Sequence, residues 1–288
     1  MRYPTLCASA LALFTVLGGC SSASMAADDN SLTLVVMDPL AAPLSCPCVK
    51  GYAQRDYTKL AEYLEDELGR KVQVVFNESL AGALEETGGR ADLVIGKRSV
   101  VAAQAHDREL PLKSVLALTD KDGQTTQTGL IVVRSSDPAK TVEDLKGYRI
   151  IFGPADCDEK HAAALALLEK HGVSKPEKIE TCAACSDGAT TILEAGEDVR
   201  AATVISSYAA PLLEGCGTIK KGDLRVVGKT EPVPFVTMFV STALPKSDQD
   251  AIVTTLKQVS EELILRIAIE SKSGFVAEPD ERVAKKKS

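Results

Sequence analysis

The sequence lacks tryptophan and is poor in aromatic residues, which make up 4% of its 288 positions. This composition argues against a carbohydrate site built from stacked aromatic rings. The chain also lacks an excess of basic residues, since 33 Lys and Arg stand against 40 Asp and Glu, for a formal net charge of -7. A surface of this sign binds polyanions poorly, which argues against nucleic acid as the main partner.

Motifs for catalysis are missing as well. The sequence contains no Gly-rich phosphate loop, no nucleophile elbow and no His-Glu zincin helix. We therefore expect a binding protein and not an enzyme.

Long apolar runs are confined to the first residues of the chain, and no later segment is long enough to span a bilayer. Arg2 precedes the apolar run LCASALALFTVLGG, which is a signal-peptide pattern. Its end, LGGC, resembles a bacterial lipobox. We expect a signal peptide over 1–19, lipidation of Cys20 and a tether over 20–30, which predicts a membrane-anchored periplasmic lipoprotein. Ordinary cleavage near Ser24 to Ala26 is the alternative and predicts a soluble periplasmic protein.

Eight cysteines are present, of which Cys7 lies in the predicted leader and Cys20 is the expected lipidation site. An even number of cysteines in an exported protein usually forms disulfides. The six candidates are Cys46, Cys48, Cys157, Cys182, Cys185 and Cys216. Cys182 could pair with Cys185, or Cys157 with one of these two, whereas a bond between Cys46 and Cys48 would be strained.

Short apolar strands alternate with amphipathic helices in the first part of the chain. We predict strands at 32–37, 71–76 and 91–96, a helix from Tyr57 to Leu68 that ends at Gly69, and a short helix at 79–86. The βαβαβ order predicts a parallel sheet with helices on its faces.

The alternation repeats in the second part. Strands are predicted at 129–134, 148–153, 178–181, 202–206, 223–228 and 235–241. A helix is predicted from about Cys157 to His171, with Asp156 as its N-cap, and helical spacing recurs over 248–270. Because about 260 residues are too many for one core, we predict two lobes. Lobe I would hold residues 31–126 and 237–278, lobe II residues 127–236, and 279–288 would be a disordered tail.

Three stretches resemble the phosphate, phosphite and phosphonate substrate-binding proteins of ABC importers. They are YTKLAEYLEDELGRKVQVVF, TGLIVVRSSDPAKTVEDLKGYRIIFGPADC and LRVVGKTEPVPFVTMFVSTALP. The resemblance implies an α/β fold of the type II periplasmic-binding-protein class: a two-lobed clamshell in which two hinge strands join βα sheets flanked by helices. It also implies a monomer that binds a small phosphonate- or phosphate-type ligand between its lobes and delivers it to an ABC permease.

The ligand-binding positions of the family match less well. The loop expected to wrap an oxyanion at a helix N-terminus reads GPADCDEKH here, with Asp156, Asp158 and Glu159. Two like unit charges 4 Å apart repel by roughly 4 kcal/mol at an effective dielectric constant of about 20, which argues against an anion in this loop. The candidate ligand-binding residues therefore come from several loops: Lys97, Arg98, Ser99, Asp156, Cys157, Asp158, Ser186, Asp187, Ser206, Ser207 and Tyr208.

A soft-metal site is the alternative interpretation of the cysteines. Cys157 and His161 would share one face of a helix turn. With Cys182 and Cys185 on the neighbouring loop they form a set suited to zinc or copper. A metal-handling or partner-binding accessory protein is therefore the alternative function; otherwise no cofactor is expected.

Overall fold

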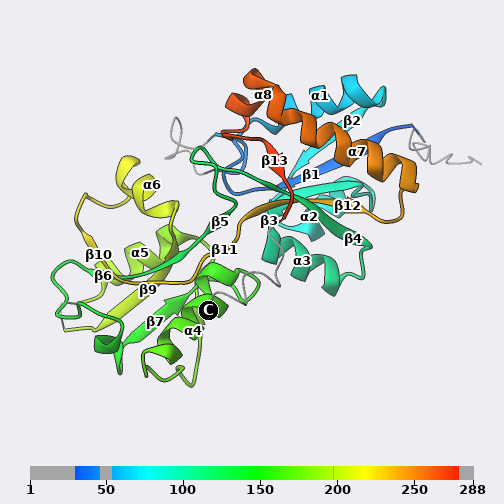
Figure 1. Ribbon diagram of the computed structural model, residues 1–288. Coiled ribbons are helices and arrows are strands. Elements are labelled where there is room, and N and C mark those ends of the chain that lie inside the picture. Colours follow the sequence, from blue (N-terminus) through cyan, green and yellow to red (C-terminus); the bar gives the residue numbers. More distant parts are fainter. Residues whose placement is uncertain (1–29, 46–53, 197, 279–288) are drawn as a thin grey trace, which may run out of the picture.

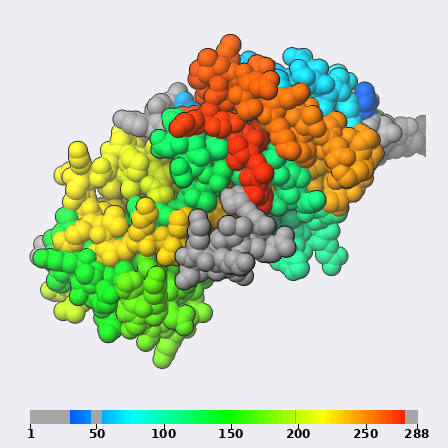
Figure 2. Space-filling view, in the orientation of Figure 1, coloured from blue at the N-terminus to red at the C-terminus, as the bar shows by residue number. Residues whose placement is uncertain are grey.

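The computed structural model describes residues 30–45, 54–196 and 198–278, and Figure 1 shows them as two lobes joined by extended strands. In the space-filling view the C-terminal helices, in orange, cover the outer surface of one lobe, and the other lobe, in green and yellow, lies beside it (Figure 2). The predicted leader, Cys20, Cys46, Cys48 and the predicted tail lie outside the described residues.

Lobe I is built on a six-stranded sheet in the order β13-β4-β12-β3-β1-β2. β1 pairs in parallel with β2 and β3, whereas β12 runs antiparallel to β3 and β4, and β13 runs antiparallel to β4. The strands are β1 (Leu32–Met37), β2 (Val72–Phe76), β3 (Leu93–Lys97), β4 (Leu112–Leu118), β12 (Val236–Ser241) and β13 (Phe275–Val276).

Helices cover both faces of this sheet because the side chains of β1 alternate between two cores. Leu34 and Val36 pack in one core with α1 (Tyr57–Leu68), α7 (Lys246–Gln258) and α8 (Leu263–Ala268). Val35 and Met37 pack in the other with α2 (Leu80–Glu86) and α3 (Arg98–Asp107). The predicted helical stretch over 248–270 is divided into α7, the 3-10 turn η4 (Val259–Glu261) and α8.

The predicted strand β1 and helix α1 are confirmed in type and extent. Asp56 caps α1 by accepting a hydrogen bond from the backbone N–H of Thr58 at 3.0 Å. Gly69 ends the helix with a φ of 62°, a left-handed conformation that glycine adopts without a Cβ clash.

Lobe II has a five-stranded sheet in the order β10-β6-β9-β7-β8. One face packs against α4 (Ala162–Lys170) and the other against α5 (Cys185–Glu194) and α6 (Ala209–Gly215). The strands are β6 (Gly129–Arg134), β7 (Arg149–Phe152), β8 (Glu180–Thr181), β9 (Ala201–Ser206) and β10 (Leu224–Lys229). A single 3-10 turn, η2 (Glu143–Leu145), lies between β6 and β7. The chain passes between the lobes in β5 (Thr126–Gln127) and β11 (Val233–Pro234), which pair antiparallel.

The prediction of one continuous helix from Cys157 to His171 is wrong. The chain instead makes a 3-10 turn, η3 (Asp158–Lys160), and α4 begins at Ala162. Asp156 does not cap a helix, and its carboxylate accepts a hydrogen bond from Gln104 of α3 at 3.1 Å. The physical reason is that Glu159 and Lys160 are buried, with exposures of 1% and 4%, so both side chains turn into the interior.

Candidate functional site

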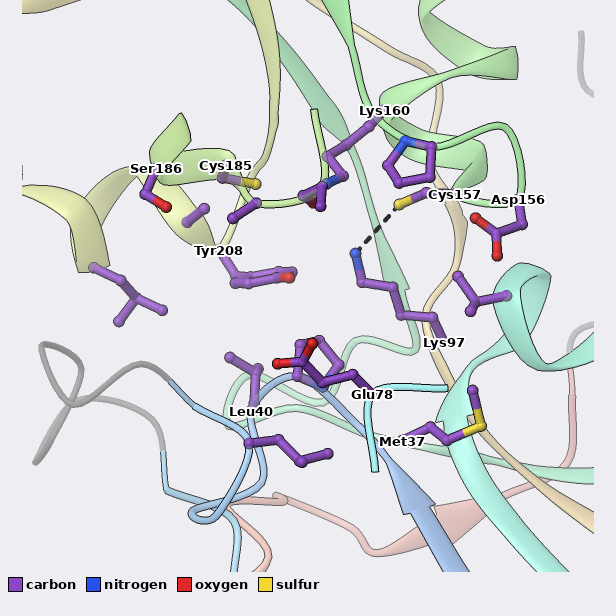
Figure 3. Close-up of a pocket in the computed structure, with 18 of the residues that line it drawn as sticks. Met37, Leu40, Glu78, Lys97, Asp156, Cys157, Lys160, Cys185, Ser186 and Tyr208 are labelled. Carbon is purple, nitrogen blue, oxygen red and sulfur yellow. Dashed lines mark hydrogen bonds between the residues drawn. The ribbon is translucent and has the colours of Figure 1, made fainter. Parts of the chain in front are cut away.

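A cavity of about 610 Å³ lies between the lobes, and both sheets direct strand ends toward it. Figure 3 shows Lys160, Cys185 and Ser186 of lobe II opposite Leu40 and Glu78 of lobe I. Its lining is mostly apolar. The polar and ionisable lining residues are Glu78, Lys97, Gln104, Asp156, Cys157, Lys160, Cys185, Ser186 and Tyr208.

Lys97, the last residue of β3, crosses from lobe I into a buried polar cluster of lobe II. Its Nζ lies 2.6 Å from Glu159 Oε1, 3.4 Å from Cys157 Sγ and 3.4 Å from Ser206 Oγ. The ammonium group also lies 5.4 Å from the centre of the Tyr208 ring, close enough for a cation–π contact. The end of β3 is thereby joined to η3 and to the end of β9.

The Lys97–Glu159 pair is ionised at neutral pH. Burial disfavours the charge on Lys97, but Tyr208, Glu159 and Cys157 outweigh it and raise the lysine pKa. For Glu159, burial alone would raise the pKa. The charge of Lys97 and the hydrogen bonds from Lys97, Ser206 and Cys157 have the larger, opposite effect, so the pKa of Glu159 is lowered. A buried ion pair of this kind is stable only where both partners are well hydrogen-bonded, as they are here.

Lys160 supplies a second cation to the cavity, and its surroundings differ. Its Nζ donates to the backbone carbonyl of Ala183 at 3.0 Å, and within the described ranges no carboxylate lies in ion-pair distance of it. Ala183 and Ala184, which precede α5, and the first α5 residues Cys185 and Ser186 line the same part of the cavity. The N-cap of α5 makes no side-chain hydrogen bond, so the first backbone N–H groups of α5 lack a side-chain acceptor from their cap.

Two further polar contacts join the lobes along the α3 edge of the cavity. Gln104 Nε2 donates to Asp156, and the backbone N–H of Asp158 donates to Ser99 Oγ at 3.2 Å. Burial and the neighbouring Glu159 raise the pKa of Asp158, while Arg98 opposes this shift. The acidic loop is thus tied to lobe I by its own side chains and backbone.

The structure brings part of the predicted ligand-binding set into the cavity lining: Lys97, Asp156, Cys157, Ser186 and Tyr208. Ser206 is buried behind it in contact with Lys97. The remaining residues lie outside the lining. Arg98 pairs with Glu278 at 3.3 Å, Ser99 and Asp158 contact each other, Asp187 is exposed, and Ser207 Oγ accepts from the backbone of Thr128.

Sequence reasoning missed four residues of the site, namely Glu78, Gln104, Glu159 and Lys160, as ligand-facing or supporting groups. Both Glu159 and Lys160 fall in the first turn of the helix predicted from Cys157 to His171, where charged residues are ordinary. A local signal for Glu159 and Lys160 is present in DCDEKH, where an acidic and a basic residue are adjacent. If both are buried, each needs a partner from another element, because unpaired buried charges are costly.

The cysteines do not form the predicted disulfides among the described residues. Cys157, Cys182, Cys185 and Cys216 are free thiols, so the suggested bonds between Cys182 and Cys185, or from Cys157 to either, are absent. Burial raises the pKa of Cys157 to about 12, although Lys97 opposes the shift. This thiol therefore stays protonated and donates to Glu159 at 3.2 Å.

The predicted soft-metal set is not assembled either. His161 Nδ1 lies 2.9 Å from the carbonyl of Gly153, and its ring packs against Phe152. Within the part of the chain that the structure describes, no group of three or more His, Cys, Asp or Glu side chains could hold a metal ion. The same residues contain no helix long and apolar enough to cross a membrane.

Two α/β lobes, two connecting strands and a cavity between them define a two-lobed solute-binding protein. The family model for "ABC transporter, phosphonate, periplasmic substrate-binding protein" matches residues 51–281, and the chain belongs to this family. Members are transport proteins that bind a small molecule and work with an ABC permease, which confirms the expectation of a binding protein. No curated protein sequence matches the chain.

Solved structures with this fold share little sequence with the chain. A binding protein component of an ABC phosphonate transporter from Pseudomonas aeruginosa superposes with a TM-score of 0.65 at 14% identity, covering 90% of this chain and 85% of that one. PhnD1 from Prochlorococcus marinus, solved with methylphosphonate, gives 0.63 at 11% identity, covering 89% and 96%. The aliphatic sulphonate binding protein SsuA from Escherichia coli gives 0.56 at 17%, covering 89% and 83%. The predicted type II periplasmic-binding-protein fold is confirmed.

Proposed function

We propose that this protein captures a small oxyanion with an apolar substituent, of the phosphonate type, in the cavity between its lobes and delivers it to an ABC permease. Family membership supports the transport role. The observation that carries the proposal is Lys160, a buried cation that lines the cavity and donates to a single backbone carbonyl.

Lys160 and the start of α5 form the proposed anion subsite. Backbone N–H groups and the positive end of the helix dipole favour a negative charge at a helix N-terminus. A cation buried beside these donors adds charge-assisted hydrogen bonds, which are stronger than neutral ones. Ser186 lines the same part of the cavity, and its hydroxyl donates to Asp187 at 3.3 Å.

The substituent of the ligand would lie against the apolar part of the lining. Leu40 and Leu44 of lobe I and Leu212 and Leu213 of α6 supply this surface. Burying apolar ligand area contributes about 25 cal/mol per Å², so a small alkyl group adds to affinity without any charge. PhnD1, solved with methylphosphonate, and the aliphatic sulphonate binding protein have this fold, and each binds an oxyanion joined to carbon.

Isothermal titration calorimetry tests the binding role. The protein is titrated with methylphosphonate, its monoethyl ester, methanesulfonate, inorganic phosphate and small zwitterionic phosphonates. We expect at least one oxyanion of this panel to bind with a micromolar Kd. Absence of a heat signal and of thermal stabilisation across the whole panel would reject the proposed ligand class.

We also propose that the protein is a monomer held at the membrane by a lipid on Cys20, which lies in the lipobox-like LGGC. Two measurements test this. Metabolic labelling with a radioactive fatty acid should mark the wild-type protein and not Cys20→Ala, and light scattering of the domain should give the mass of one chain. Equal labelling of both proteins would rule out Cys20 as the lipidation site.

A further inference from the structure

The positive charge of Lys97 is already satisfied within the protein. Its ammonium group has three N–H donors, and three acceptors of lobe II lie around it: Glu159 at 2.6 Å, Cys157 at 3.4 Å and Ser206 at 3.4 Å. In Figure 3 the lysine amine points toward Cys157, and it also lies 5.4 Å from the centre of the Tyr208 ring. No donor of this lysine is left for an anion in the cavity.

Glu159 is held firmly in its position. Its Oε1 accepts from Lys97, from Ser206 Oγ at 2.7 Å and from Cys157 Sγ at 3.2 Å, and 2% of its side chain is exposed. Its backbone is equally constrained, because a Cβ added at Gly129 would lie 1.9 Å from the carbonyl oxygen of Glu159. The carboxylate therefore occupies a fixed site next to the cavity.

The remaining charge of the cavity is small and its sign is negative. Four charged residues of the described chain line it, Lys97 and Lys160 against Glu78 and Asp156. With Lys97 neutralised by Glu159, Lys160 stands against two carboxylates, of which Glu78 is exposed and Asp156 half-buried. One negative charge on a ligand is compensated by Lys160, whereas a second would enter a mostly apolar cavity without a counter-ion.

We infer that Glu159 is a resident counter-anion for Lys97 that determines specificity: it makes the cavity select singly charged oxyanions, such as phosphonate monoesters and sulfonates, over doubly charged ones such as sulfate. The inference rests on the proposed oxyanion-binding function. The inference adds to that function the charge class of the ligand and names Glu159 as the residue that determines this class.

Matched pairs of probes test this on the full domain. Methanesulfonate and sulfate have similar tetrahedral heads with one and two charges, and the monoethyl ester of methylphosphonate and methylphosphonate itself form a second pair at alkaline pH. In the wild type we expect the singly charged member of each pair to bind at least tenfold more tightly. In Glu159→Gln, Lys97 regains a free charge, and we expect sulfate to gain at least tenfold relative to methanesulfonate.

Glu177→Gln is the matched control, since it removes the same charge from an exposed position of lobe II that does not line the cavity. Its sulfate-to-methanesulfonate ratio should equal that of the wild type. Equal binding of the two members of each pair by the wild type overturns the inference alone, and this measurement needs no variant to fold. An unchanged ratio in folded Glu159→Gln also overturns it. If none of the probes binds to the wild type, the proposed function is rejected, and the inference is rejected with it.

Discussion

Replacing Lys160 by glutamine removes the proposed counter-charge for the ligand while leaving a side chain that can still donate a hydrogen bond. The lysine is 4% exposed and lies 3.0 Å from the Ala183 carbonyl, so an anion beside it would be largely shielded from water. A hydrogen bond to a charged group contributes about 1.5–3 kcal/mol. Because 1.4 kcal/mol corresponds to a factor of ten, Kd should rise by about 10- to 100-fold.

Calorimetric titration with methanesulfonate and with the monoethyl ester of methylphosphonate measures this change. Lys160→Arg keeps the charge and should retain more affinity than Lys160→Gln. Lys170→Gln is the control, since this α4 lysine is 69% exposed and pairs with the exposed Glu231 at 3.6 Å. A Kd for Lys160→Gln within threefold of the wild type, with an unchanged melting temperature, would refute the assignment of the anion subsite.

Three further predictions concern stability. Asp38→Asn leaves buried Arg55 without its carboxylate at 2.8 Å and should lower the free energy of unfolding in urea by about 3 kcal/mol; a loss under 1 kcal/mol contradicts this. Gly188→Ala places a Cβ 2.3 Å from a β9 hydroxyl and should cost about 1–3 kcal/mol, unlike the roomier Gly196→Ala, and equal melting temperatures contradict it. Glu159→Gln should cost up to about 3 kcal/mol at neutral pH. The folded-state pKa of Glu159 lies below its ordinary value of 4.5, so the ion pair stabilises the wild type fully above pH 4.5 and this stabilisation is lost as the pH falls through the lowered pKa. The urea unfolding curves of wild type and Glu159→Gln should therefore converge in acid and differ at neutral pH.

The parts of the fold that the sequence predicted are those controlled by local chemistry. β1 is an apolar run interrupted by Thr33, and α1 combines helical spacing with Asp56 at its start and Gly69 at its end. Such signals act over a few residues, so one sequence contains them in full. The order of strands and helices then limited the topology to two βα lobes.

The site was harder to predict because its key contacts join residues far apart in the chain. Lys97 and Glu159 are 62 positions apart and belong to different lobes. Read locally, the acidic residues before AAALALLEK are typical of a helix N-terminus. In the structure, the contact with Lys97 prevails over this preference, and the segment becomes a 3-10 turn with its charges directed inward.

This dependence on contacts between distant residues also explains why the sequence identified the family but not the ligand. The resemblance rests on strands, hinge segments and turns that build the two lobes, and those positions say nothing about charge in the cavity. The acidic loop argues against an anion when each carboxylate is counted as free. Once Glu159 is paired with Lys97, its share of that repulsion is removed. Asp156 keeps its charge and is held by Gln104, and Lys160 lies in the cavity without an acidic partner among the described residues. The charges that matter for binding are therefore those left after the protein has paired its own groups. Among the described lining residues Lys160 is the cation without a carboxylate partner, so it can compensate one negative charge of a ligand and not two.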